Sequence, residues 1–109
     1  MKTIEFFRIP NVPECTVILP QGLSLIDADV ETDDKTDDEI NIYYMDDRAS
    51  DQTVVLTWYV LTLGMEVADN FPGVFFKRVT MSDGFVRFLF FKQDAKKRPP
   101  IVAVVKDAK

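Results

Sequence analysis

The segment that most constrains the fold is Thr53–Leu63, with the sequence TVVLTWYVLTL. Branched and aromatic side chains suit a strand better than a helix, because they crowd the preceding helical turn. Successive side chains of a strand point to opposite faces. Both faces are apolar here, with Val54, Leu56, Trp58 and Val60 on one and Val55, Tyr59, Leu61 and Leu63 on the other. A strand covered on both faces predicts a sandwich, a tightly curled barrel or an oligomer interface.

Shorter strand patterns, separated by proline and glycine turns, occupy much of the remaining chain. They are predicted at Thr3–Ile9, Cys15–Leu19, Leu23–Val30, Ile40–Met45, Val74–Thr80, Phe85–Lys92 and Ile101–Val105. Val74–Thr80 and Phe85–Lys92 are expected to pair as a hairpin, because Asp83-Gly84 supplies the positive φ of a tight turn. Glu31–Glu39 holds no apolar residue and is predicted as an exposed loop. The sequence therefore predicts an all-β fold, a small antiparallel β-sandwich or open barrel of about eight short strands.

The chain is expected to form one β domain over residues 1–92. Residues 93–109 begin as a basic linker and end with the β-prone run Ile101–Val105. We expect this tail to belong to the same domain or to make an oligomer contact. No apolar run approaches the roughly 18 residues of a membrane helix, and the N-terminus lacks the apolar core of a signal peptide. With Cys15 as the single cysteine, a cytoplasmic protein is expected.

The absence of histidine excludes most catalytic and metal-binding designs. Histidine is the commonest general base and metal ligand, so Ser-His and Cys-His pairs and Cys/His zinc sites are removed. A calcium loop is disfavoured too, since Thr32 stands where the loop needs glycine and Asp38 where it needs Glu. Carboxylate pairs such as Glu66 with Asp69 remain, and nothing places them in a cleft. We therefore expect a protein that is not an enzyme and holds no cofactor or metal.

Charge is divided along the chain. Residues 27–51 hold 11 acids and two bases, whereas residues 77–109 hold nine bases and three acids, within a net charge of −5. The acidic segment contains four aspartates that we expect to contact a partner: Asp33, Asp34, Asp37 and Asp38. An alternative is that the acids of residues 27–51 mimic the phosphates of DNA in the groove of a DNA-binding protein. The basic C-terminal third of the chain argues against this alternative. The overall acidity also argues against direct nucleic-acid binding.

Aromatic residues make up 12% of the chain. A domain of this size does not readily bury so many, so part of them is expected on an exposed patch. Phe75 and Phe76 are expected to contact a partner protein or a second copy of the chain. The same hairpin carries four bases, Lys77, Arg78, Arg87 and Lys92. Bases beside aromatic rings could hold a phosphate and stack a nucleobase, although the two faces of an ordinary surface hairpin are the favoured explanation of the pattern.

Several short motifs resemble a group of small phage and prophage β-strand accessory proteins of unassigned function. The resemblance covers about residues 2–92 and is carried by Lys2-Thr3-Ile4, Ile9-Pro10, TVILPQG at 16–22, YVLTLG at 59–64, and the aromatic hairpin with Gly73-Val74-Phe75 and Phe85–Phe91. The acidic 31–39 segment and the basic 93–109 tail depart from that pattern. The resemblance implies an accessory protein in the cytoplasm of an infected bacterium, and it assigns no functional residue.

These observations predict a non-enzymatic, homo-oligomeric binding protein that inhibits a host defence protein by direct contact. Two alternatives stay open. The first is a sponge that sequesters an anionic, nucleotide-type signalling molecule at the four hairpin bases. The second is a small virion or assembly protein in which Ile101–Val105 pairs with the sheet edge of a neighbouring subunit.

Overall fold

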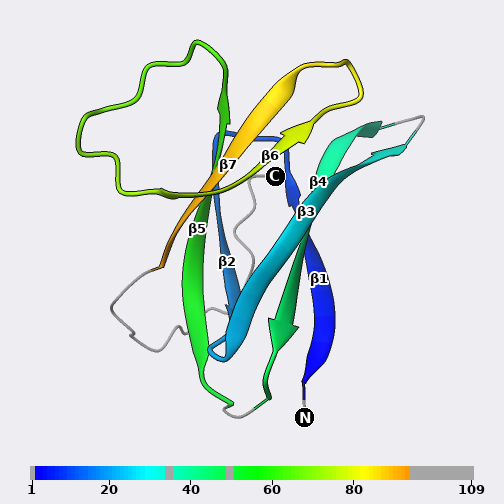
Figure 1. Ribbon diagram of the computed structural model, residues 1–109, viewed down its shortest axis with the longest axis vertical. Coiled ribbons are helices and arrows are strands. Elements are labelled where there is room, and N and C mark those ends of the chain that lie inside the picture. Colours follow the sequence, from blue (N-terminus) through cyan, green and yellow to red (C-terminus); the bar gives the residue numbers. More distant parts are fainter. Residues whose placement is uncertain (1, 34–35, 49–50, 94–109) are drawn as a thin grey trace.

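The computed structural model describes residues 2–33, 36–48 and 51–93 (Figure 1). These residues form seven strands and no helix: β1 (Thr3–Pro10), β2 (Glu14–Pro20), β3 (Leu23–Asp33), β4 (Thr36–Asp46), β5 (Thr53–Thr62), β6 (Val74–Thr80) and β7 (Val86–Gln93). The all-β prediction is thus confirmed. The predicted eighth strand, Ile101–Val105, lies outside the described residues. In the described part of the chain, no helix has the length and apolarity needed to cross a membrane.

The strands form two antiparallel sheets that pack face to face as an open sandwich. One sheet has the order β1-β4-β3 and the other has the order β2-β5-β7-β6. The chain changes sheet after β1, β2 and β4, so neighbours in sequence often lie in different layers. The edge strands β3 and β6 approach each other along one side, where Lys77 Nζ lies 2.7 Å from Asp27 Oδ1. A salt bridge therefore joins the two sheets at that side.

The core lies between the sheets and centres on β5. This strand lies between β2 and β7 in the four-stranded sheet. Trp58 is 0% exposed and packs against Phe7 of the other sheet and against Phe76 and Phe91, with ring centroids 5.4–6.0 Å apart. Burying these rings and their aliphatic neighbours is the main source of stability in a domain of this size.

The prediction of an exposed loop at Glu31–Glu39 is wrong. β3 runs to Asp33 and β4 starts at Thr36, so most of the acidic segment forms the end of a long hairpin. Arg8 of β1 lies beside this stretch, with its side chain 3.0 Å from Glu31 and 4.0 Å from Glu39. The guanidinium offsets the repulsion between these two paired carboxylates. The backbone ladder, set in register by buried pairs nearer the core, then continues through the acidic stretch.

The hairpin of β6 and β7 forms as predicted. Gly84 in its turn has a φ of 92°, the left-handed conformation that glycine adopts without steric cost. The pairing contains a β-bulge between Phe75 and Lys77. A bulge adds one residue to one strand and so changes which side chains face the core.

Candidate functional site

Four large apolar side chains are exposed at one end of the sandwich, near the end of β5 and the β6–β7 turn. Leu63 is 79% exposed and Phe85 is 67% exposed, and Met65 and Val67 are more than two-fifths exposed. The pairing of Thr62 with Arg87 places Leu63 and Phe85 at the same end of the neighbouring strands β5 and β7. We call Leu63, Met65, Val67 and Phe85 the apolar end surface.

The connection between β5 and β6 is anchored although residues 63–70 are all exposed. Met65 N–H donates to the Thr62 carbonyl at 3.1 Å, and Phe71 N–H donates to the Ala68 carbonyl at 3.0 Å. The Phe71 ring packs edge-on against Tyr59 and Phe90, with centroids 4.9 and 5.4 Å apart. Figure 1 shows this segment as a broad green loop standing away from the sheets. Its apolar side chains are therefore exposed on a loop that the Phe71 ring holds against the four-stranded sheet.

A groove of about 480 Å³ lies between Leu63 and Phe85. Thr62 and Leu63 form one side of it, and residues 84–87 form the other. Arg87 is the one charged residue among those that line the groove, and its Nη1 donates to the Val86 carbonyl at 3.0 Å. The groove is thus mostly apolar, with a guanidinium in its wall.

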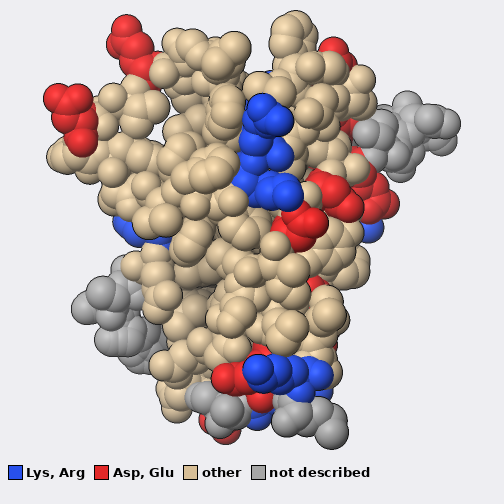
Figure 2. Space-filling view, in the orientation of Figure 1, with Lys and Arg blue, Asp and Glu red and all other residues tan. Residues whose placement is uncertain are grey.

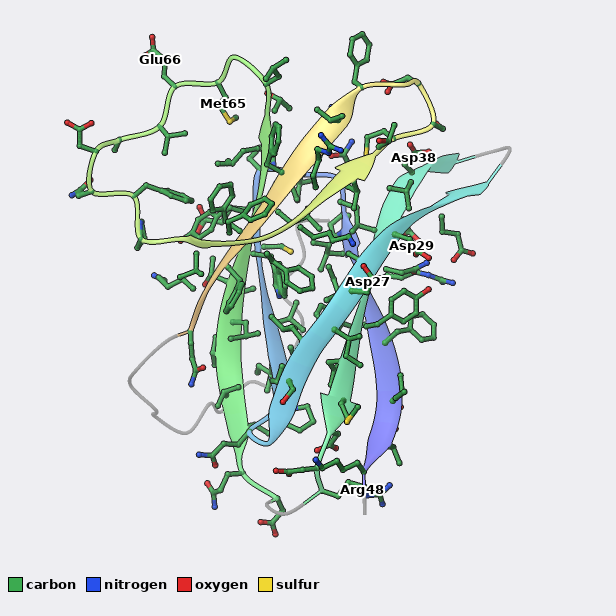
Figure 3. All side chains as sticks on the ribbon, viewed as in Figure 1. Asp27, Asp29, Asp38, Arg48, Met65 and Glu66 are labelled. Atoms are coloured by element: carbon green, nitrogen blue, oxygen red, sulfur yellow. The ribbon has the colours of Figure 1, made fainter. Side chains whose placement is uncertain are left out.

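The charges around the loop are sparse and acidic. The connection carries Glu66 and Asp69 and contains no lysine or arginine between residues 63 and 73. In Figure 2 two acidic groups stand out at the upper left from a surface without other charge. Figure 3 shows Glu66 pointing out from the loop, while Met65 points in a different direction.

Of the four aspartates predicted to contact a partner, the structure describes the side chain of one. Asp34 lies outside the described residues, and for Asp33 and Asp37 only the backbone is described, in β3 and β4. Asp38 makes intramolecular contacts: its Oδ2 accepts a hydrogen bond from Ser82 N–H at 2.7 Å, and its Oδ1 lies 2.9 Å from Ser82 Oγ, which donates to it. Asp38 therefore ties the β6–β7 turn, which precedes Phe85, to the other sheet.

Phe75 and Phe76, the two phenylalanines predicted to contact a partner, lie on opposite faces of β6, as successive residues of a strand do. Phe75 is more than half exposed and packs against Phe90, with ring centroids 5.5 Å apart. Phe76 turns inward, where its ring contacts Trp58 and Phe91. The hairpin thus offers one of these two rings to a partner and uses the other in the core.

The four hairpin bases divide between the two faces of their sheet. Lys77 and Arg87 are in register with the buried residues Leu89 and Val79. Arg78 and Lys92 fall on the outer face. Arg78 of β6 pairs with Phe88, which lies four residues before Lys92 on β7, about 13 Å along the strand. The structure therefore does not bring the four bases together.

Lys77 is already paired, because it forms the salt bridge to Asp27 that joins the sheets. Its hydrogen bond, together with one from the Ala28 backbone N–H, holds the pKa of Asp27 below its ordinary value. Figure 2 shows this pairing as basic groups lying beside acidic ones, over β6 and β3. In Figure 3 Asp27 and Asp29 lie along β3, and Asp38 lies near the start of β4.

A polar network on the outer face of the three-stranded sheet was not predicted. Asn41 is buried at its centre, where it accepts from Arg8 Nε at 3.0 Å and donates to Asp29 and Glu31 at 3.1 Å. Tyr43 O–H donates to Asp29, and desolvation followed by the Asp29 charge raises the pKa of Tyr43 above 10.0. These partners come from three strands, so no motif of neighbouring residues in the sequence indicates the network. The network satisfies a buried amide and orients the strands.

Part of the apolar end surface was not expected: Phe85 lies within the Val74–Lys92 hairpin, one of the two predicted contact surfaces, whereas Leu63 was assigned to the core strand and Gly64–Gly73 to a connection. The available signal was Met65 and Val67, two apolar residues in a segment with no strand period that would bury them. In the described part of the chain, no three acidic or cysteine side chains gather as a metal site would require. Comparison with protein-family models, curated proteins and solved structures found no match to this chain.

Proposed function

We propose that this chain is a non-enzymatic binding protein that docks on another protein through the apolar end surface. The observation that carries the proposal is the exposure of Leu63 and Phe85 on either side of one groove. Covering such a side chain contributes about 1.5–3 kcal/mol. The loop is already held by its turns and by Phe71, so docking costs less ordering entropy than it would for a free segment.

The charge of the loop favours a protein partner over a nucleic acid or a lipid surface. Glu66 and Asp69 stand beside the apolar side chains, and no base accompanies them in the connection. Phosphates of a nucleic acid or of anionic lipids would repel these carboxylates. A protein groove with an apolar floor and a basic rim complements both features. In keeping with the phage resemblance, we propose that the partner is a host protein in the bacterial cytoplasm and that docking inhibits it.

The other two functions receive less support. A nucleotide sponge would need the hairpin bases to converge, whereas they lie on two faces and Lys77 is paired with Asp27. The assembly alternative depends on Ile101–Val105, which lies outside the described residues. A homo-oligomer remains a competing use of the same surface, and the experiment below separates it from a host protein.

The test compares the wild-type chain with a double variant, Leu63→Asp/Phe85→Asp, and with the control Ile4→Asp. Ile4 is 67% exposed, as Phe85 is, but it lies on β1 in the other sheet. Host proteins captured by the wild type and by Ile4→Asp are purified, and their Kd is measured by calorimetry. We expect binding to the double variant to be weaker by at least about tenfold, which corresponds to about 1.4 kcal/mol. Binding to Ile4→Asp should be unchanged.

Native mass spectrometry of the same proteins reports their subunit number. An oligomer that the double variant dissociates would assign the apolar end surface to a second copy of the chain and contradict the proposal. Equal affinity of the wild type and the double variant for the captured protein would contradict it as well. Inhibition is supported if the activity of the captured protein falls on adding the wild type and not on adding the double variant.

A further inference from the structure

A pocket of about 280 Å³ lies between the two sheets, toward the opposite end of β5 from the apolar end surface. Six apolar side chains line it: Leu23 and Leu25 of β3, Val54 and Leu56 of β5, Phe76 of β6 and Phe91 of β7. Two exposed glutamines, Gln21 and Gln93, complete the lining. None of these eight residues carries a charge.

The pocket lies beside β6, which is shorter than β3 and β5. β6 starts at Val74, opposite Phe91, and Gln93 of β7 lies opposite Leu56. In contrast, β5 extends to Thr53 and β3 extends to Leu23. Figure 1 shows β6 confined to the upper half of the sandwich, while β3 and β5 reach its lower end. At the lower end of the sandwich the inner faces of β3 and β5 therefore face each other, and side chains of β6 do not fill the space between them.

We infer that this pocket binds a neutral, largely apolar small molecule that carries one hydroxyl or carbonyl group. A cavity of about 150 Å³ holds benzene, so the pocket fits a molecule of about twice that volume. An ion would lose its hydration against six apolar side chains and would meet no opposite charge among the described residues that line the pocket. The amides of Gln21 and Gln93 can each donate and accept a hydrogen bond to orient such a molecule. Because the pocket is separate from the apolar end surface, this inference does not rest on the proposed function.

Trp58 provides a reporter for the pocket. It is the one tryptophan in the sequence and has no exposed surface. Its ring lies 5.6 Å from Phe76 and 5.4 Å from Phe91, centroid to centroid, and both of these residues line the pocket. A quencher dissolved in water cannot reach the Trp58 ring. A quencher held in the pocket is separated from that ring by one phenylalanine side chain.

The experiment titrates the full chain with para-bromobenzyl alcohol, a neutral probe whose bromine quenches indole fluorescence at short range. We expect saturable quenching of Trp58 with a Kd of about a millimolar or lower, as suits a ligand of this size. The comparison probe is para-bromobenzoate, which keeps the ring and replaces the hydroxymethyl group with a carboxylate. It should bind at least about tenfold more weakly, because none of the eight described lining residues can neutralise its charge.

Two matched substitutions locate the site. Val54→Phe fills the pocket with a ring and should weaken binding of the alcohol at least about tenfold. Val55→Phe adds the same ring at the next residue of β5, on the opposite face, and should leave binding unchanged. Leu23→Phe serves as the filling variant if Val54→Phe fails to give a wild-type circular dichroism spectrum. Quenching without saturation, equal binding by the filling variant and Val55→Phe, or equal affinity for the carboxylate would overturn the inference.

Discussion

Replacing Asp38 with alanine tests how the β6–β7 turn is held against the other sheet. Asp38 lies in β4 and accepts two hydrogen bonds from Ser82, from the backbone N–H at 2.7 Å and from the hydroxyl at 2.9 Å. The two residues are separated by 44 positions and connect the two layers of the sandwich. Losing these bonds should free the turn that precedes Phe85.

The size of the effect follows from where the bonds lie. A hydrogen bond contributes about 0.5–1.5 kcal/mol net, and more when one partner is charged. Both bonds to Ser82 are solvent-accessible, so we take the low end for each and expect the free energy of unfolding to fall by about 1–2 kcal/mol. For a domain of about this length each kcal/mol shifts Tm by roughly 4–8 °C, so Tm should fall by about 5–15 °C.

Urea and thermal unfolding followed by Trp58 fluorescence measure this loss. Ser82→Ala removes only the hydroxyl bond and should cost about half as much, and the double variant should show a coupling energy of about 0.5 kcal/mol or more. Glu39→Ala is the matched control, because the next residue of β4 makes a 4.0 Å ion pair with Arg8 that contributes about 0–1 kcal/mol. The reasoning is refuted if Asp38→Ala has the same Tm as Glu39→Ala. It is also refuted if the losses in free energy of unfolding caused by Asp38→Ala and Ser82→Ala are additive, because this pair would then not hold the turn.

Two further predictions concern the core and the salt bridge between the sheets. Leu89→Ala removes a fully buried side chain and should lower the free energy of unfolding by about 2–5 kcal/mol, whereas Phe85→Ala should change it by less than about 0.5 kcal/mol. Urea unfolding measures both, and equal losses would contradict the assignment of Phe85 to the surface. The pKa of Asp27 is lower in the folded chain than its ordinary value of 3.8, so its stabilising contribution is present above that value and is lost as the pH falls through the folded pKa. Unfolding measured between about pH 2 and pH 7 should show the wild type losing stability relative to Asp27→Asn below about pH 4, and a constant difference across this range would contradict the prediction.

The sequence alone determined the strands and their turns. Alternation of side chains, β-branched residues and proline or glycine breaks act over a few neighbouring residues, so the seven described strands could be located approximately without tertiary information. The two apolar faces of Thr53–Leu63 predicted a sandwich, a barrel or an oligomer interface, and β5 belongs to a sandwich of two sheets. Gly84 has the positive φ that Asp83-Gly84 predicted. Each of these features follows from local steric preference and from burial that repeats every second residue.

Only the tertiary structure decided which residues meet and which remain exposed. Arg8 reaches Glu31 and Glu39 because β1 and β3 flank β4, and this contact lies on the acidic hairpin that the sequence suggested was a loop. The bulge in β6, which places Lys77 in register with buried Leu89 and turns Val79 toward the core, depends on the pairing with β7. Val60 and Leu63 are both apolar residues of one predicted strand. Val60 is buried because the other sheet covers it, and Leu63 is exposed because β5 ends one residue before it. An apolar pattern shows which residues can be covered, and the packing of the layers determines which of them are.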